Sequence, residues 1–261
     1  MCDLLTISSR RACKASRSLP AFAICGKHNC DGWGVGFFDS EGRAEVRKSR
    51  DPAYRENRDA VDEGLLKVAE EVTSRYFLGH VRFASCGEVC DANCHPFKLA
   101  FLGRDWLFAH NGTCRGIVGY MSAREPVLEA RNDSARIFEY LRDRLLDAHA
   151  EETGRPFFQA LAEATLGLVN EFDDAADTFN YLLCNGSALF VFMHHRPFYV
   201  LHRRKTDGDA LVMTTCGDEG DGGITDGEQW FRMKDCDRDH GLLLMIVDDM
   251  IVARQEITRG E

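Results

Sequence analysis

The chain has 261 residues, of which 44% are hydrophobic and 28% charged, a composition typical of a globular protein with a sizeable core. Its formal net charge of -10 argues against nucleic acid as a partner, because an acidic protein gains nothing from displacing counterions. The length, without a repeat or a linker to divide it, predicts a single domain over residues 1–261.

Targeting signals are missing from the sequence. No apolar run reaches the length that crosses a membrane, and residues 1–5 lack the basic region and apolar stretch of a secretory signal. We therefore expect a cytoplasmic protein without membrane contacts. In that compartment the 11 cysteines should be reduced, so metal binding, catalysis or burial as small apolar residues explains them better than disulfides do.

The first half of the chain predicts several strands and one helix. Apolar residues at helical spacing predict the helix at residues 58–74. Short apolar or alternating segments predict strands at residues 4–8, 33–37, 44–48, 76–84 and 106–109. The second and third of these strands are close enough in sequence to pair as a hairpin.

The second half begins with two helices and continues with strands only. Asn132 or Asp133 can cap the first helix, and the second is expected at residues 157–170. Strands are expected at residues 181–183, 188–193, 199–202, 211–214, 242–247 and 250–254. Asn185-Gly186 predicts a hairpin between the first two strands, and Asp248-Asp249 predicts another between the last two. Strands at both ends with helices between them favour an α+β fold of stacked antiparallel sheets with outer helices.

Cys2 is the first candidate for chemistry. Removal of Met1 would leave an N-terminal cysteine with a free α-amine, whose ordinary pKa of about 7.7–8.0 lies near working pH. Such an amine can act as the general base for its own thiol, directly or through a water molecule. A cysteine at position two can also occur by chance.

Two further segments allow a catalytic or a structural interpretation. Arg82 ends an apolar strand, where its planar fork suits either a substrate carboxylate or an ordinary salt bridge. Asn111 and Gly112 follow another apolar run, where they form either a hairpin turn or two donors directed at an oxyanion.

Two more segments are equally open. Asp133 suits either the start of a helix or the binding of an α-ammonium group. The glycines that follow Asp31, beginning with Gly32, allow either close approach of a substrate to the backbone or tight sheet packing.

Taken in order, these segments resemble the signature of class II glutamine amidotransferases, in particular the small single-domain branch. The matching residues are Cys2, Asp31-Gly32, His80-Val81-Arg82, His95-Pro96, His110-Asn111-Gly112 and Asp133-Ser134. The resemblance spans most of the chain and implies the four-layer αββα sandwich of N-terminal nucleophile hydrolases.

The resemblance also implies a role for each residue. Cys2 would be the nucleophile and its α-amine the base, while Asn111 and Gly112 would form the oxyanion hole. Arg82 would bind the α-carboxylate of the substrate and Asp133 its α-ammonium group. The remaining residues expected in the substrate site are Asp31, Gly32, Ser85 and His110.

The implied substrate is glutamine or another γ-glutamyl compound, and no cofactor is expected. One version of the enzyme passes ammonia to a separate synthase. The other hydrolyses a γ-glutamyl conjugate, as related enzymes of thiol-histidine biosynthesis do.

A rival from another class is a non-catalytic metal or redox sensor on the same fold, which would retain Met1. Two cysteine-rich clusters motivate it, Cys86, Cys90, Cys94 with His95, and Cys25, His28 with Cys30. Their spacing is not that of a common zinc ribbon, so we expect incidental cysteine-rich loops without metal.

Overall fold

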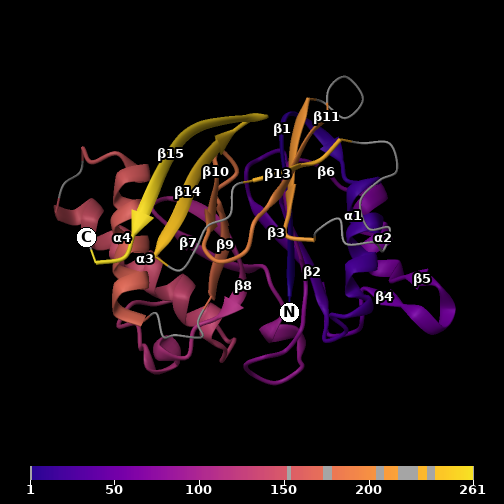
Figure 1. The fold of residues 1–261 in the computed structure, drawn as a ribbon, viewed down its shortest axis with the longest axis horizontal. Helices are drawn as coiled ribbons and strands as arrows, with labels where there is room; N and C mark the ends of the chain where they lie inside the picture. Colours follow the sequence, from indigo (N-terminus) through magenta and orange to yellow (C-terminus); the bar gives the residue numbers. More distant parts are fainter. Residues whose placement is uncertain are drawn as a thin grey trace.

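The computed structural model describes residues 2–151, 154–172, 178–203, 209–216, 229–233 and 239–260. Two antiparallel sheets lie face to face in the middle of the molecule, with a pair of helices outside each (Figure 1). This arrangement confirms the predicted α+β sandwich of four layers.

The first sheet has the strand order β13-β11-β12-β1-β6-β2-β3. Its strands are β1 (Asp3–Lys14), β2 (Trp33–Phe38), β3 (Ala44–Ser49), β6 (Thr73–Val81), β11 (Tyr199–Arg203), β12 (Ala210–Thr214) and β13 (Phe231–Arg232). Helices α1 (Ser18–Ala23) and α2 (Glu63–Glu71) cover its outer face. A separate pair of short strands, β4 (Tyr54–Arg55) and β5 (Ala60–Val61), lies beside these helices.

The second sheet has the order β15-β14-β10-β9-β8-β7. Its strands are β7 (Phe97–Phe101), β8 (Arg104–Thr113), β9 (Thr178–Cys184), β10 (Leu189–Met193), β14 (His240–Val247) and β15 (Met250–Thr258). Helices α3 (Asp133–Glu151) and α4 (Phe157–Phe172) cover its outer face. The predicted hairpins β2–β3, β9–β10 and β14–β15 are all present.

Three apolar cores fill the spaces between the layers. One lies between α3, α4 and the second sheet, one between the two sheets, and one between the first sheet and α1 and α2. The middle core explains why β9 and β10 are buried along almost their whole length, since they are covered on both faces. None of the described helices is long and apolar enough to cross a membrane.

The predicted helix at residues 58–74 was too long at both ends. Residues 60–61 pair with β4, and the helix begins only after Asp62, whose carboxylate accepts from Gly64 N at 2.9 Å. At the other end, residues from Thr73 onward belong to β6. The strand β7 was missed, although its apolar residues alternate with Lys98 and Ala100 in the sequence.

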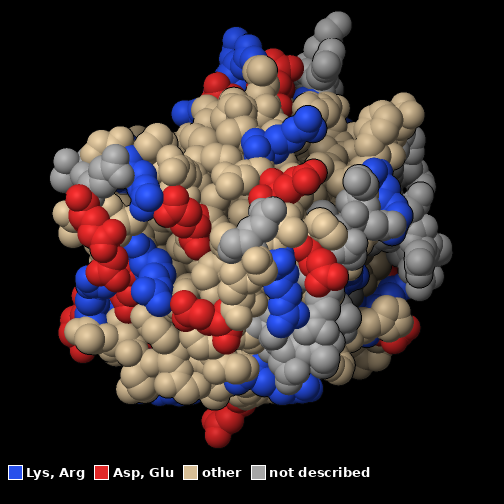
Figure 2. Space-filling view, turned by 60° about the vertical axis from the view of Figure 1, so that its left-hand side comes forward, with Lys and Arg blue, Asp and Glu red and all other residues tan. Residues whose placement is uncertain are grey.

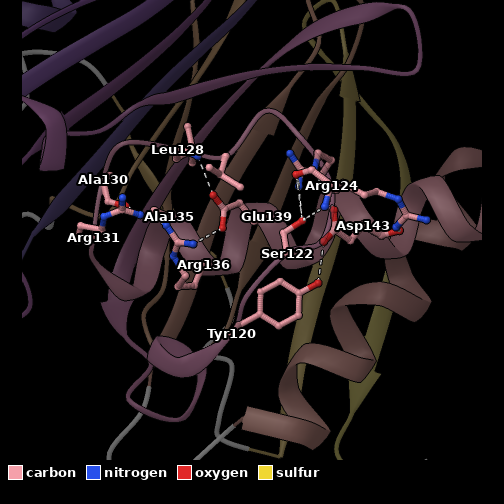
Figure 3. Close-up of polar contacts among 12 residues, drawn as sticks. Tyr120, Ser122, Arg124, Leu128, Ala130, Arg131, Ala135, Arg136, Glu139 and Asp143 are labelled. Carbon is pink, nitrogen blue, oxygen red and sulfur yellow. Dashed lines mark hydrogen bonds and ion pairs between the residues drawn. The ribbon is translucent and has the colours of Figure 1, made fainter.

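A polar belt fixes residues 120–131 to one side of α3 (Figure 3). Glu139 accepts from Leu128 N at 2.7 Å and pairs with Arg136 at 2.5 Å. Tyr120 donates to Asp143 Oδ2 at 2.8 Å. These contacts hold the helix whose first turn reaches the candidate site.

Acidic and basic side chains are intermixed on the face shown in Figure 2, where neither sign forms a continuous patch. On this face the net negative charge of the sequence is therefore spread out and not gathered into a binding surface for a highly charged polymer.

Candidate active site

Cys2 lies just before β1, beside the residues that follow β6. Its half-buried thiol donates to Phe83 O at 3.2 Å, and Phe83 N lies 3.2 Å from the same sulfur. Burial raises the pKa of the Cys2 thiol to about 11, and the backbone hydrogen bond with Phe83 opposes this shift. The thiol is therefore protonated at neutral pH and needs a base before it can attack a substrate.

The thiol opens onto a small pocket at the ends of the two sheets. Its volume of about 20 Å³ is room for about one water molecule, so it has to widen to admit an amino acid. The pocket is lined by Cys2, His80, Arg82, Phe83, Ser85, Cys86, His95, His110, Gly112, Asn132, Asp133 and Ser134. Six of the residues predicted from the sequence are in this set, namely Cys2, Arg82, Ser85, His110, Gly112 and Asp133.

Arg82 is buried and only partly hydrogen-bonded. Its Nη2 atom donates to Cys86 O at 3.2 Å and is 3.5 Å from Gly87 O. Its Nη1 atom is buried and has no hydrogen-bond partner in the described part of the chain. An unsatisfied buried guanidinium nitrogen is costly, so this atom is suited to receive an anionic group from a ligand.

Asp133 occupies the first turn of α3 and ties it to the end of β8. Its Oδ2 atom accepts from Cys114 N at 2.7 Å, and its Oδ1 atom accepts from Ser134 N at 2.8 Å. The cap itself is Asn132, which accepts from Ala135 N at 2.9 Å. Asp133 also lines the pocket, and there both of its carboxylate oxygens accept hydrogen bonds from the protein.

Gly112 and Asn111 lie side by side on β8 but face different surroundings. Gly112 lines the pocket, and a Cβ atom there would stand 1.8 Å from Thr178 O, so no larger residue fits. Asn111 is not among the lining residues. Its amide donates to the carbonyl of Cys2 and lies 3.3 Å from Thr215 Oγ1.

His110 and Ser85 border the pocket through fixed hydrogen bonds. The His110 ring contacts Ser134 Oγ at 2.9 Å and Thr178 O at 3.1 Å. Because a carbonyl only accepts, Nε2 of His110 donates to Thr178 O. The Ser134 hydroxyl lies between Nδ1 of His110 and Asp133 Oδ1, which is 3.3 Å from Ser134 Oγ, so both ring nitrogens of His110 have hydrogen-bond partners. Ser85 Oγ lies 3.0 Å from Thr113 Oγ1.

Two uncharged imidazoles form the floor of the pocket. The rings of His80 and His95 are buried with their centroids 4.2 Å apart. Burial lowers the pKa of His80 to about 3 and lowers that of His95 as well, and the neighbouring Arg82 charge adds to both shifts. Within the described part of the chain, none of their ring nitrogens has a hydrogen-bond partner.

Asp31 and Gly32 lie behind the pocket and do not line it. Gly32 O accepts from Arg82 N at 2.8 Å, and Asp31 Oδ2 accepts from Ala84 N at 2.8 Å. Gly32 has a φ of 124°, and a Cβ atom there would lie 2.6 Å from Cys94 Sγ. These residues therefore hold the backbone on both sides of Phe83 against the thiol.

The groups that surround the backbone of Cys2 were not predicted from the sequence. Arg196 donates to the Cys2 carbonyl at 3.0 Å and pairs with Asp3 at 2.9 Å. Asp3 also accepts from Asn29 at 2.8 Å and from Thr215 at 2.9 Å. The position of Asp3 next to Cys2 was visible in the sequence, but Arg196 belongs to a loop that carries no motif.

The cysteine clusters do not form a metal site in the described part of the chain, where no three histidine, cysteine or acidic side chains are arranged to hold an ion. The side chain of Cys25 lies outside the described part, so the second cluster is only partly tested. Cys86, Cys90 and Cys94 are free thiols. Cys216, however, is disulfide-bonded, which corrects the expectation that all cysteines are reduced.

Comparisons with known proteins support the same family. The family described as "Glutamine amidotransferases class-II" matches residues 1–212. The gamma-glutamyl-hercynylcysteine sulfoxide hydrolase of Mycolicibacterium smegmatis is 32% identical over 195 residues, which cover 74% of this chain and 73% of that protein.

Solved structures share the fold. A predicted glutamine amidotransferase from Pseudomonas aeruginosa superimposes with a TM-score of 0.61 at 22% identity and covers 96% of this chain and 99% of its own. The glutamine phosphoribosylpyrophosphate amidotransferase of B. subtilis also gives 0.61, at 14% identity, over 98% of this chain and 49% of that one. With a family match over residues 1–212, the chain belongs to the class II glutamine amidotransferases.

Proposed function

We propose that the protein hydrolyses the γ-amide bond of glutamine or of a γ-glutamyl conjugate, with Cys2 as the nucleophile. The observation that carries the proposal is the lining of one pocket by a thiol, a buried arginine with an unused donor, and a helix-bound carboxylate. Arg82 would bind the α-carboxylate of the substrate, and Asp133 would bind its α-ammonium group.

In this mechanism the thiol of Cys2 transfers its proton to the residue's own α-amine, and the sulfur attacks the γ-carbonyl carbon. The oxyanion is stabilised by the amide of Asn111 and the backbone N–H of Gly112. The amine leaves with the proton from the α-ammonium group, and water then cleaves the γ-glutamyl thioester to release glutamate. The raised pKa of the thiol makes the base essential.

The α-amine exists only when Met1 has been removed, and Met1 lies outside the described residues. With Met1 attached, the nitrogen of Cys2 is an amide and is not basic. We expect the form that begins at Cys2 to release glutamate and the form that retains Met1 to be inactive. The measurement is glutamate release by both forms, verified by N-terminal mass analysis. Equal activity of the two forms would refute the α-amine as the base.

Two substrate classes remain within this proposal. The M. smegmatis relative is named for a γ-glutamyl conjugate, which supports hydrolysis of a conjugate. Transfer of ammonia to a separate synthase is the alternative, and it requires free glutamine as the substrate. Comparing kcat/KM for glutamine with that for a series of γ-glutamyl amides separates the two.

A further inference from the structure

The carbonyl of Cys2 accepts hydrogen bonds from two side chains. One donor is the amide of Asn111, and the other is Nη1 of Arg196 at 3.0 Å. A carbonyl oxygen has two lone pairs, so this acceptor is fully used. The donors come from different parts of the chain, since Asn111 lies on β8 and Arg196 lies in the loop between β10 and β11.

The same guanidinium also holds the residue that follows the nucleophile. Nη2 of Arg196 lies 2.9 Å from Asp3 Oδ1, and the Asp3 side chain is almost completely buried. Arg196 therefore spans the peptide unit between Cys2 and the Asp3 side chain. A planar fork with two nitrogens at fixed spacing can make both contacts, whereas an ammonium group cannot make them in the same geometry.

The loop that carries Arg196 is itself fixed to the second sheet. The carbonyl of Arg196 accepts from Asn180 Nδ2 at 2.6 Å, and Asn180 Oδ1 accepts from His194 N at 2.9 Å. Asn180 is the direct partner of Asn111 in the pairing of β8 with β9. Asn111 is therefore one donor to the Cys2 carbonyl, and its pairing partner Asn180 holds the loop that carries the other donor, Arg196.

The hydrogen bonds that Asn111 makes in the structure conflict with its proposed role in the oxyanion hole. Both amide hydrogens of Asn111 are used in the structure, one by the Cys2 carbonyl and one by Thr215 at 3.3 Å. To stabilise an oxyanion, Asn111 has to release one of them. When it does so, Arg196 still satisfies the Cys2 carbonyl, and no buried acceptor is left without a partner.

We propose that Arg196 is a positioning residue that holds the backbone of the nucleophile and thereby frees Asn111 for the oxyanion. The inference rests on the proposed function, because it assumes the γ-amide as substrate and the α-amine of Cys2 as base. It assigns a role to a residue that no motif of the family resemblance includes.

The positive charge of Arg196 adds a second, measurable effect. Because Arg196 donates to the carbonyl of the same residue, its charge disfavours the ammonium form of the α-nitrogen of Cys2. The other charged or titratable groups that line the pocket or pair at Cys2 are Asp3 from β1, His80 from β6, His110 from β8, Asp133 from α3, and Arg82, Cys86 and His95 from the connecting segments. Removing the Arg196 charge leaves Asp3 unpaired, and both changes raise the pKa of the amine.

The test uses Arg196→Met and Arg196→Lys in the chain that begins at Cys2, with Arg47→Met on the exposed edge of β3 as the control. Arg196→Met should lower kcat roughly tenfold to 10²-fold and move the acidic limb of kcat/KM upward by about one pH unit. Arg196→Lys should lower kcat without moving that limb, because the charge is retained. Arg47→Met should change neither quantity.

A readout without substrate keeps this inference distinct from the proposed function. The rate of alkylation of Cys2 by iodoacetamide is followed on the N-terminal peptide as a function of pH. In Arg196→Met the increase of this rate with pH should begin at a higher pH than in the unaltered chain. If that shift occurs while the unaltered chain hydrolyses no γ-glutamyl amide, the proposed substrate is wrong and the role of Arg196 at the thiol stands. Unshifted profiles of both alkylation and kcat/KM in Arg196→Met would overturn the role of Arg196.

Discussion

Two buried arginines in this molecule have opposite surroundings. Arg142 on α3 donates from Nε to Asp143 at 2.9 Å and from Nη2 to Ser122 at 2.5 Å, and its Nη1 atom donates to the carbonyl of Pro126. Arg82, which lines the same pocket as Cys2, leaves Nη1 without a partner in the described part of the chain. The two guanidinium groups are buried to a similar degree, so burial alone does not distinguish them.

The Arg142 guanidinium is fully hydrogen-bonded within the protein, whereas the Arg82 guanidinium has a donor that is available to a ligand. In the polar belt of α3, every guanidinium nitrogen of Arg142 donates to a protein oxygen, so its charge stabilises the fold. At the pocket, one donor of Arg82 is unsatisfied and the two imidazoles of its floor have no partners among the described residues. Unsatisfied buried donors cost stability, and the pocket recovers that cost only when a ligand binds.

Loss of Arg142 should have the largest effect on the free energy of unfolding. Arg142→Met leaves the buried Asp143 carboxylate without its cationic partner, which should lower the free energy of unfolding by about 3–5 kcal/mol. Arg144→Met is the matched control on the same helix, because its exposed pair with Glu171 contributes at most about 1 kcal/mol. Urea denaturation measures both values. Equal losses in the two variants would show that the belt is not a stabilising network.

Arg82→Lys should show the opposite behaviour. The ammonium group cannot reproduce the fork, so kcat/KM for a γ-glutamyl amide should fall about 10²-fold, mainly through KM. The free energy of unfolding should change by less than about 1 kcal/mol, because one donor of Arg82 contributes nothing to the unliganded fold. Steady-state kinetics and urea denaturation test the two halves of this prediction, with the exposed Arg47→Lys as the control. An unchanged KM would show that Arg82 does not bind the substrate.

The lowered pKa of His80 should make the stability of the protein depend on pH. The pKa of His80 is lowered to about 3 in the folded protein, whereas the unfolded chain has the ordinary value of about 6.5. Below pH 6.5 the unfolded state binds a proton that the folded state does not, so stability decreases as the pH falls. Between pH 6.5 and 5 this contribution of His80 should amount to about 1.6 kcal/mol.

The measurement is the free energy of unfolding as a function of pH for His80→Gln, with the exposed His149→Gln as the control. The slope of this free energy against pH reports the number of protons taken up on unfolding. His80→Gln should lower that number by about one, while the part that arises from His95 remains. A slope in His80→Gln equal to that of the unaltered chain would mean that His80 is charged in the folded protein.

The smallest effect is expected at the helix caps. Asn132→Ala removes the cap of α3 and Asp62→Ala removes the cap of α2, and each should cost about 1 kcal/mol of stability. Only Asn132→Ala should also raise KM, because the first turn of α3 presents Asp133 to the pocket. A similar KM for the two variants would show that the start of α3 does not contribute to substrate binding.

Much of the fold could be read from the sequence, because apolar periodicity reports which face of an element is buried. The hairpin at Asn185-Gly186 was correct, and Gly186 adopts the positive φ of 77° that such a turn needs. The helix before Thr73 was placed too broadly because residues 60–61 have a helical pattern yet pair with β4. Pairing with a distant strand is a tertiary contact that local spacing does not encode.

For the site, the ordered motifs in the sequence determined which residues to consider, and six of the nine residues expected in the site line one pocket. Only the tertiary structure decided their surroundings. It placed Asp31 behind the pocket, turned the Asn111 amide to the Cys2 carbonyl, and brought Arg196 to the same carbonyl. The physical reason is that a motif records the identity of a side chain, whereas its hydrogen-bond partners depend on which strands and loops pack beside it.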